Sequence, residues 1–313
     1  MGLLVSLWSS PMHTRSVVLA APVLAICALL YPVSGLAWGD EGHRIVGRIA
    51  LPLLTSAART QVDALLAADD DALTAPDFVS RTVWADRWRD SDRNTTKVRY
   101  TATQQWHFVD IEIARPDLSD ACAGQRPLPE GTPASRGPAR DCVVDKVEQF
   151  AAELADTTLP QAERILALKY LLHFTGDLHQ PLHAADNHDQ GGNQVQVLYG
   201  HHHVASRLHA YWDTAVVQRI GRDEAEVAGV LTETFAAELT VWQRGKPADW
   251  ALESFAAAKN VAYALPTATV PDEHGTPAYV LDDAYEQRAA AAAREQLAKA
   301  GSRLAALLNA ALH

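Results

Sequence analysis

The segment Leu171–His183, LLHFTGDLHQPLH, constrains the fold of this chain more than any other segment. It continues a stretch, AERILALKY, whose apolar residues recur at the spacing of a buried helix. His173 and Asp177 are four residues apart and therefore share one helix face. Pro181 removes a backbone donor and should end or kink the helix, which directs His183 away from that face. Buried ionisable groups are costly unless they are paired or bind a metal ion, so the segment predicts a helix that ends in a metal site.

Further histidines and aspartates lie beside tryptophans elsewhere in the chain, in WGDEGH, WADRWR, QWHFVD and RLHAYWD. The candidate ligands in these motifs are His43, Asp86, His107, His209 and Asp213. Nitrogen and oxygen ligands without cysteine suit zinc, and also manganese or iron. A single His-x-x-x-Asp pair on a helix is more often a buried hydrogen-bonded pair. Two such pairs together with the further sites are hard to explain by packing, and they predict metal binding.

Residues 1–37 have the pattern of a secretory signal peptide. TRSVVLAAPVLAICALLYPVSGLA has one basic residue, an apolar stretch and a small-residue ending, with Gly35 and Ala37 at the −3 and −1 positions of a cleavage site. The residues before Met12 fit this pattern poorly, so Met12 is an alternative start. The alternative function is an uncleaved membrane anchor, although the apolar run is short for a span. Cleavage after Ala37 predicts a secreted or periplasmic protein that begins at Trp38 and has no membrane segment.

Residues 38–313 predict one large, mostly helical domain, without a long linker or an internal repeat. Apolar residues recur at helical spacing in segments 55–67, 143–156, 161–174, 225–242, 250–265 and 284–312. Strand signals are few. The segment NQVQVLYG alternates and is expected to form half of a short hairpin, and KVRYTATQQWHFVDIEI is expected to be extended. The predicted fold class is all-α, with a minor β hairpin as decoration.

Charge and cysteine content narrow the function further. A formal net charge of −11 argues against a protein that grips duplex phosphates with lysine and arginine. It leaves room for a phosphate substrate if bound cations carry the positive charge. Cys122 and Cys142 flank a Pro/Gly-rich loop, and in an exported protein this arrangement predicts a disulfide worth about 3 kcal/mol. Two free thiols are the alternative.

The motifs WGDEGH, WAD, WHFVD, HFTGDLHQPLH, GGNQVQV and LHAYWD occur in this order along the chain. Together they resemble the zinc-dependent, single-strand-specific nucleases of the S1/P1 family, which share a fold group with bacterial zinc phospholipase C. The resemblance spans nearly all of residues 38–313 and includes WALES and the ending AGSRLAALLN. Each motif is modest alone, whereas the ordered set is specific.

The resemblance implies a single all-α domain with a cleft that holds three zinc ions. The implied ligands of the first ion are Asp86, His107 and His173, with Asp177 bridging to the second ion. Those of the second ion are the amine and carbonyl of Trp38, His43 and Asp177. Those of the third ion are His183, His209 and Asp213. A terminal amine has a pKa of about 7.7–8.0 and can bind a metal ion near neutral pH, so the unprocessed chain, which lacks a free Trp38 amine, is expected to be inactive.

The implied activity is hydrolysis of single-stranded DNA and RNA to products with 5′-phosphates, with removal of 3′-phosphates from nucleotides as an optional addition. Asp86 and Arg89 are the implied catalytic residues, and Arg89 would neutralise charge in the transition state. The alternative for Arg89 is a surface arginine beside Asp90. Phe108 would stack on a base and Asp110 would accept a hydrogen bond from its edge, which requires an unpaired base.

The remaining polar residues have plainer interpretations. Phe108 and Asp110 have the alternative of core packing and of an acid that supports the site from behind. Asn193, in GGN, is expected to contact substrate or to shape the site. His179 points away from the face of His173 and is expected to be structural. The cluster His201–His203 is expected to be a solvated loop, with an accessory metal or substrate contact as the alternative.

Two rival functions fit the same metal ligands. A zinc phospholipase C would act on a lipid phosphodiester, but WHFVD and Arg89 favour a nuclease and no amphipathic stretch for membrane docking stands out. A non-catalytic zinc-binding protein would explain the histidines, yet it needs neither Arg89 nor a base-stacking pair. The expected partners are single-stranded DNA, RNA and nucleotides, with no stable protein partner, and a monomer is the default.

Overall fold

The computed structural model describes residues 1–2, 38–122, 127–271 and 275–313. Apart from Met1 and Gly2, these residues belong to one unit, Ser34–His313. The expected signal peptide and the cleavage site after Ala37 lie outside the described residues. No helix in the described part of the chain combines the length and the apolar character that a membrane span requires.

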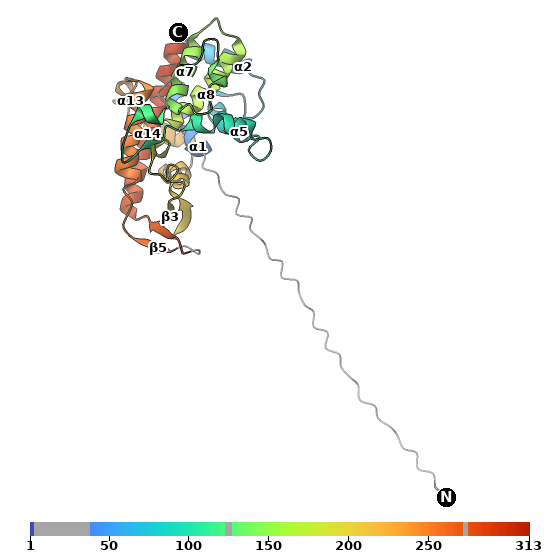
Figure 1. Cartoon of the computed structure of the whole chain (residues 1–313), viewed down its shortest axis with the longest axis vertical. Coiled ribbons are helices and arrows are strands. Elements are labelled where there is room, and N and C mark those ends of the chain that lie inside the picture. Colours follow the sequence, from blue (N-terminus) through green and yellow to red (C-terminus); the bar gives the residue numbers. More distant parts are fainter. Residues whose placement is uncertain (3–37, 123–126, 272–274) are drawn as a thin grey trace. The chain divides into compact units, whose positions relative to one another are not determined.

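The described residues are mainly helical, as predicted, with a few small strands (Figure 1). The α-helices are α1 (Gly39–Ala50), α2 (Ser56–Ala67), α3 (Phe78–Arg81), α4 (Trp84–Asp90), α5 (Val98–Thr103), α6 (Leu118–Ala121), α7 (Val143–Ala155), α8 (Gln161–Asp177), α9 (Leu208–Ala210), α10 (Val216–Ile220), α11 (Glu224–Thr234), α12 (Leu239–Trp242), α13 (Pro247–Ala257) and α14 (Asp283–Ala311). Short 3₁₀-helices are η1 (Leu51–Leu53), η2 (Gln104–His107), η3 (Ala134–Arg136) and η4 (Pro181–His183), and short π-helices are η5 (Tyr211–Ala215) and η6 (Ala258–Ala262). The strands are β1 (Ile111–Glu112), β2 (Ala185–Asp186), β3 (Gln196–Tyr199), β4 (Val204–Arg207), β5 (Thr269–Pro271) and β6 (Pro277–Val280).

Helix α8 lies at the centre of the helical core. Every residue from Ala167 to Asp177 is buried, because α8 is apolar on all sides over this stretch and packs against α7, α14 and α4. The helix ends at Asp177 and the chain turns into η4 at Pro181, as the proline predicts. The polar end of α8 is therefore inside the protein.

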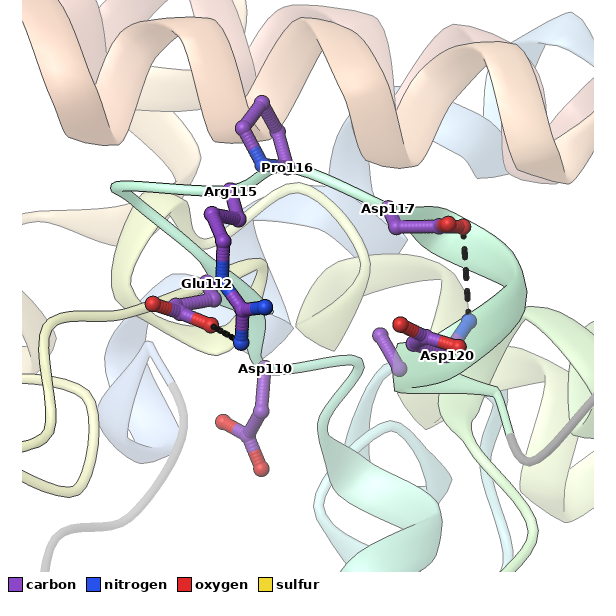
Figure 2. Close-up of a pocket in the computed structure, with 7 residues that line it drawn as sticks. Asp110, Glu112, Arg115, Pro116, Asp117 and Asp120 are labelled. Atoms are coloured by element: carbon purple, nitrogen blue, oxygen red, sulfur yellow. Dashed lines mark hydrogen bonds and ion pairs between the residues drawn. The ribbon is translucent and has the colours of Figure 1, made fainter.

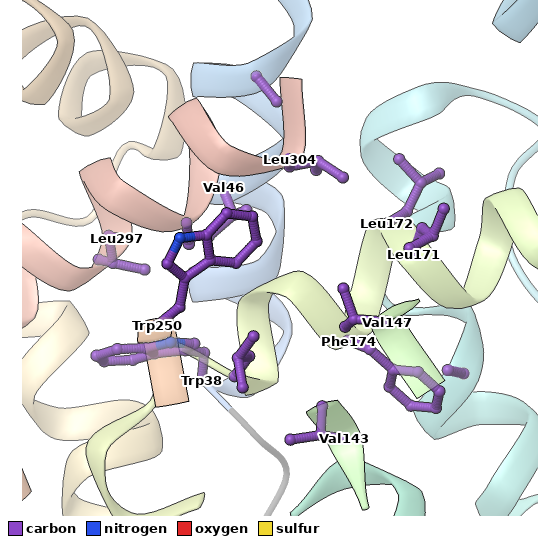
Figure 3. Close-up of a cluster of buried hydrophobic side chains, with 14 of the residues drawn as sticks. Trp38, Val46, Val143, Val147, Leu171, Leu172, Phe174, Trp250, Leu297 and Leu304 are labelled. Atoms are coloured by element: carbon purple, nitrogen blue, oxygen red, sulfur yellow. The ribbon is translucent and has the colours of Figure 1, made fainter. Parts of the chain in front are cut away.

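Helix α1 is fixed to this core by its first residues and by α14. Trp38 is fully buried just before α1, and Figure 3 shows its indole in one apolar cluster with Val46, Trp250 and Leu297. Burial of an indole is among the largest hydrophobic contributions that a single side chain makes. The start of α1 is therefore held in place by the core rather than by solvent-exposed contacts.

The predicted disulfide is confirmed. Cys122 and Cys142 are bonded, with their Cα atoms 5.0 Å apart, and the bond joins the end of α6 to the start of α7. The next residue, Val143, donates its backbone N–H to the carbonyl of Phe108 at 2.9 Å. The disulfide thus fixes a segment that supports the chain beside Phe108.

The strands form two small sheets. Strands β3 and β4 pair antiparallel, which confirms the predicted hairpin, and the larger sheet has the order β4-β3-β6-β5. Strands β5 and β6 have no expected counterpart from the sequence. Strands β1 and β2 pair parallel, with Ile111 opposite Ala185, and so bring the segment after His107 beside the segment after His183.

Two sequence predictions are wrong in detail. The segment 97–113 is not extended over most of its length, because α5 and η2 occupy residues 98–107. The Asp92 carboxylate accepts hydrogen bonds from the backbone N–H groups of Arg99 and Tyr100 at 2.9 and 3.1 Å, and this cap outweighs the strand propensity of the β-branched and aromatic residues. The helix expected over 225–242 is broken between α11 and α12, where the Phe235 ring lies against Trp242.

Gly301 tests how closely α1 and α14 must approach. An added Cβ there would lie 2.5 Å from Cβ and Cγ2 of Ile49, so we expect Gly301→Ala to lower the free energy of unfolding by about 1–3 kcal/mol. Urea denaturation followed by circular dichroism measures the change. Gly229→Ala is the matched control, because a Cβ at this exposed position of α11 meets nothing within 4 Å. Equal stability of Gly301→Ala and the wild type would contradict the close packing.

Candidate metal centre

The end of α8 contributes to a cluster of four candidate ligand atoms. His173 Nε2 lies 3.2 Å from Asp177 Oδ2 and 3.2 Å from His107 Nδ1. His107 Nδ1 lies 2.8 Å from Asp177 Oδ2. Asp86 Oδ1 lies 3.5 Å from His173 Nε2 and 3.6 Å from His107 Nδ1. Residues from α8, α4 and η2 thus direct their ligand atoms to one point.

These separations fit a tetrahedral zinc site. Zinc bonds of about 2.0–2.2 Å to nitrogen and oxygen place neighbouring ligand atoms about 3.3–3.6 Å apart in a tetrahedron. The observed separations of 2.8–3.6 Å span this range, and all four side chains are buried. Two histidines and two carboxylates also suit manganese or iron, so the donor set indicates a transition-metal site and favours zinc without excluding the others.

A second group of ligand atoms follows the break in α8. His183, in η4, lies near His209 and Asp213, and the three ligand atoms fall within 4.8 Å of one another. His209 Nε2 and Asp213 Oδ2 are 3.5 Å apart. These two atoms and His183 Nε2 are buried without a hydrogen-bond partner, which is expected of atoms that bind a metal ion. Asp213 lies in the π-helix η5, a conformation that occurs often at functional sites.

Backbone carbonyls orient three of the histidine rings. In each ring Nδ1 lies 2.7–2.9 Å from a carbonyl oxygen, which can only accept a hydrogen bond, so Nδ1 carries the proton and Nε2 keeps a free electron pair. The pairs are His173 with Thr82, His183 with His107, and His209 with Gly191. Each Nε2 is thereby prepared to bind a cation.

Gln180 holds Asp213 in place. Its Nε2 donates to Asp213 Oδ1 at 2.7 Å, and its Oε1 accepts from the N–H of Leu182. Only Oδ2 of Asp213 is left for a metal ion. Sequence reasoning did not select Gln180, although its place between Asp177 and Pro181, inside the most unusual segment of the chain, was a usable signal.

His43 reaches α8 from α1. Its Nε2 lies 3.4 Å from Asp177 Oδ1, and its ring stacks on His173 with the centroids 3.9 Å apart. Gly176 permits this approach, because a Cβ there would lie 2.6 Å from His43 Nδ1. The structure thus brings His43 to the second carboxylate oxygen of Asp177, on the side opposite the first cluster.

The placement of Trp38 differs from that of the other expected ligands. Its carbonyl accepts the N–H of Gly42 at 3.0 Å, and in the full chain its nitrogen is part of a peptide bond. Among the described residues, the candidate metal groups combine His43 with Asp86 and His173 and do not include Trp38. The structure therefore brings together all the expected side-chain ligands, and the role of the Trp38 amine stays a prediction.

The buried carboxylates lack positive charge. Burial raises the pKa of Asp213 well above its ordinary range, and the charges of Asp86 and Asp177 add to this effect. Burial also opposes the charged form of Asp86, but Arg89 and then His173 hold the pKa of Asp86 below its ordinary value. Although burial lowers the pKa of His173, Asp177 and Asp86 outweigh it and raise this pKa to about 10. A divalent cation would supply the missing charge.

Arg89 is buried rather than on the surface, with a relative exposure of 4%. Its Nη1 lies 2.7 Å from Asp86 Oδ1, while Nε and Nη2 each donate to the Asp90 carboxylate at 3.0 Å. The expected pairing with Asp90 is present, but the alternative of a surface arginine is wrong. The guanidinium group lies directly behind a candidate metal ligand.

Phe108 lies beside the second ligand group. Its half-buried ring is 4.3 Å from the ring of His183 and 6.0 Å from that of His209, between ring centroids. The interpretation of Phe108 as core packing alone does not fit this half-exposed position. A base that stacked on this ring would place its phosphate near the ligand atoms.

Asp110 faces a pocket of about 480 Å³ (Figure 2). The pocket is lined by Asp110, Glu112, Arg115, Pro116, Asp117, Asp120 and Ala121. Asp110 Oδ2 accepts a hydrogen bond from Gln105 Nε2 at 2.9 Å, and burial, with a contribution from Asp186, raises the pKa of Asp110 to about 6. Sequence reasoning missed Gln105, Glu112 and Arg115, because nothing in their spacing links them to a pocket.

The remaining candidates are structural or exposed. Asn193 donates its side-chain N–H to the carbonyl of Gln190 at 2.9 Å, so it shapes the loop whose Gly191 carbonyl orients His209. His179 donates to Thr175 O and accepts from Arg303 Nη1, which gives it the expected structural role. His201–His203 form the exposed turn between β3 and β4 and belong to none of the candidate metal groups in the described part of the chain.

Comparisons with known proteins agree with this geometry. A model of the S1/P1 nuclease family matches residues 38–313. Endonuclease 2 of Arabidopsis thaliana is 27% identical over 90% of this chain and 93% of its own length. Nuclease PA3 of a Penicillium species and nuclease P1 of Penicillium citrinum are each 26% identical over 87% of this chain and 97% of their own length.

Gln180→Leu tests the orientation of Asp213. The substitution removes the hydrogen bond to Asp213 Oδ1 with little change in volume, and loss of such an outer contact weakens metal binding by about 10–100-fold. Competition with a chromogenic zinc chelator measures the affinity of each site. Gln296→Leu is the control, because it makes the same change at a buried glutamine that contacts no candidate ligand. Unchanged zinc affinity in Gln180→Leu would contradict this role.

Proposed function

The chain belongs to the S1/P1 nuclease family, and from this premise we propose that it cleaves single-stranded DNA and RNA to products with 5′-phosphates. It is a nuclease that hydrolyses phosphodiester bonds. The observation that carries the proposal is the half-buried Phe108 ring next to a buried cluster of metal ligands. The family match also favours a nuclease over the phospholipase C and the zinc-storage alternatives.

The family is metal-dependent, and we propose three zinc ions for this chain. The proposed ligands are Asp86, His107, His173 and Asp177 for the first ion; Trp38, His43 and Asp177 for the second; and His183, His209 and Asp213 for the third. Zinc ions bound there would activate water for attack on phosphorus and would neutralise charge on the phosphate oxygens. The two oxygens of Asp177 face different partners, 2.8 Å from His107 Nδ1 and 3.4 Å from His43 Nε2, which suits a shared ligand.

Arg89 is proposed to act from behind Asp86. Its guanidinium group is held by Asp90 and by Asp86, so it is rigid, and it keeps the Asp86 carboxylate ionised. Fixed positive charge in a buried site stabilises the additional negative charge of a phosphoryl transition state without reorganisation. Asp86 and Arg89 are therefore the proposed catalytic pair of α4.

Phe108 and Asp110 are proposed to bind the base on one side of the scissile bond. A base on the Phe108 ring must be unstacked from its neighbours and unpaired, which explains a preference for single strands. Asp110 would accept a hydrogen bond from the base edge, with its carboxylate oriented by Gln105. Asn193 contributes by shaping the adjacent loop. The same site suits a terminal 3′-phosphate, so a 3′-nucleotidase activity is part of the proposal.

We propose that the mature protein is exported, by a signal peptide that spans residues 1–37 and is cleaved after Ala37. The start of the family match at Trp38 supports this boundary and a nuclease domain of residues 38–313. After cleavage the protein would act as a monomer, without a membrane segment or a stable protein partner. Its substrates would be single-stranded nucleic acid and nucleotides.

Product analysis tests the proposed activity. The form that begins at Trp38 is incubated with single-stranded RNA or DNA, with and without a zinc chelator, and the released ends are identified by mass spectrometry. We expect 5′-mononucleotides, whose release stops with the chelator and returns when zinc is added back, because the ligand cluster requires a cation. Products with 3′-phosphates, or release that the chelator does not affect, would contradict the proposal.

Retention of Ala37 tests the proposed role of the Trp38 amine. In a form that begins at Ala37, the Trp38 nitrogen is an amide and no longer a metal ligand, so we expect bound zinc to fall from three ions per chain to two. Elemental analysis of both forms measures the zinc content independently of activity. Because Trp38 keeps its side chain, thermal unfolding of zinc-free protein should match in the two forms. Equal zinc content would show that the amine is not a ligand.

A further inference from the structure

The segment that joins α4 to α5 is unusually basic for this chain. Between Asp86 and Arg99 there are five basic and three acidic residues, in a protein with a net charge of −11. The basic residues are Arg87, Arg89, Arg93, Lys97 and Arg99. Together Trp88, Arg93, Lys97, Arg99 and Tyr100 form a surface that we name the α4–α5 patch.

A stack of flat side chains runs outward through this patch. Trp84 is fully buried, and Trp88 stacks on it with a centroid distance of 5.3 Å and an interplanar angle of 23°. The Arg99 guanidinium carbon lies 3.8 Å from the Trp88 ring centroid. Trp88 is half-buried and Arg99 is exposed, so the outermost plane of the stack faces solvent. A planar guanidinium group held in this way presents a flat cationic face.

The loop that carries these cations is preorganised. The Asp92 carboxylate accepts from Thr96 Oγ1 and from the N–H groups of Arg99 and Tyr100, and Arg99 Nη1 donates to Ser91 Oγ at 2.9 Å. Lys97 has a left-handed backbone with φ 57° and an exposed side chain. Within the described residues, neither Lys97 nor Arg99 has an ion pair with a carboxylate. Both charges are therefore available to a ligand.

An exposed apolar side chain lies in the same loop. Val98, between the two cations, has a relative exposure of 68%. Beside it the Arg93 guanidinium carbon lies 4.9 Å from the ring centroid of Tyr100, which is half-buried. Aromatic and apolar faces interleaved with unpaired cations are the combination that binds single-stranded nucleic acid, because bases stack while phosphates pair with the cations.

The patch is connected to the candidate metal centre. Helix α5 runs directly into η2, which ends at the candidate ligand His107, and α4 carries Asp86 (Figure 1 places α5 beside the core helices). The helical rise over the eight residues from Arg99 to His107 is about 12–16 Å. A strand bound at Phe108 and longer than a few nucleotides could therefore reach Arg99.

We propose that the α4–α5 patch binds the part of a single-stranded substrate that extends beyond the cleaved bond. A base stacks on the outer face of the Arg99 guanidinium, and Lys97 pairs with a backbone phosphate. This inference rests on the proposed function, because it assigns the patch to the same substrate. A dinucleotide occupies only the metal centre and does not contact the patch.

The test compares a long and a short substrate. In Lys97→Gln/Arg99→Gln we expect KM for an oligothymidylate of about 20 nucleotides to rise about tenfold, with kcat unchanged, because stacking and charge pairing are lost. Hydrolysis of a thymidine dinucleotide should stay at the wild-type rate. The slope of log(kcat/KM) against log salt should become shallower by about 1.4, which is about 0.7 for each lost phosphate contact. Arg99→Lys should keep the salt slope and still raise KM, since lysine lacks a planar group.

Arg244→Gln/Lys246→Gln is the matched control, because it removes two exposed cations from another loop without altering the patch. The inference is wrong if the patch variant keeps the wild-type KM and salt slope, if the control loses as much, or if the dinucleotide is affected equally. Fluorescence anisotropy with a hydrolysis-resistant phosphorothioate oligonucleotide measures binding without cleavage. Weaker binding by the patch variant, with a wild-type enzyme that cleaves neither substrate, would support the patch and refute the proposed function. Matching thermal unfolding curves verify that the variants are folded.

Discussion

The burial of three carboxylates around the end of α8 is the constraint on which the rest of the structure depends. Asp86, Asp177 and Asp213 are shielded from water, and desolvation of each charged carboxylate costs several kcal/mol unless a partner compensates for it. Arg89 and protonated His173 offset part of this charge. Because the other rings present neutral electron pairs, the remaining charge has to come from bound cations. Metal binding at this site would therefore stabilise the fold as well as enable the chemistry.

The ligand-bearing segments also orient one another. The carbonyl of His107, a candidate ligand of one group, accepts from Nδ1 of His183, a candidate ligand of another. The Val109 N–H donates to the carbonyl of His183 at 2.8 Å, and the β1–β2 pairing continues this alignment. The two ligand groups are thus joined by backbone hydrogen bonds as well as by α8. A displacement of one group would be transmitted to the other, so the spacing between metal ions is set by main-chain geometry, which is stiffer than side-chain packing.

The parts of the site that could be predicted from sequence are those set by local geometry. The four-residue spacing of His173 and Asp177 and the break at Pro181 follow from helix periodicity and proline stereochemistry. The parts that could not be predicted depend on distant contacts. Gly176 matters only because His43 arrives from α1, and Gln180 only because Asp213 lies within its reach. The same holds for the fold: the major helices were found, whereas α5 was taken for an extended segment because its cap by Asp92 lies outside the segment's own pattern, and β5–β6 had no counterpart.

The acidic composition and a polyanionic substrate are compatible because charge acts over short distances. At physiological salt the Debye length is about 8 Å, so a substrate phosphate responds to the few charges nearest to it and hardly to the net charge of −11. Near the candidate metal centre those charges would be bound cations and Arg89, and near α5 they are Lys97 and Arg99. Elsewhere the acidic surface would repel duplex nucleic acid, whose stiff backbone cannot follow a narrow basic path. A flexible single strand can follow such a path, so the charge distribution favours the same substrate as the stacking requirement at Phe108.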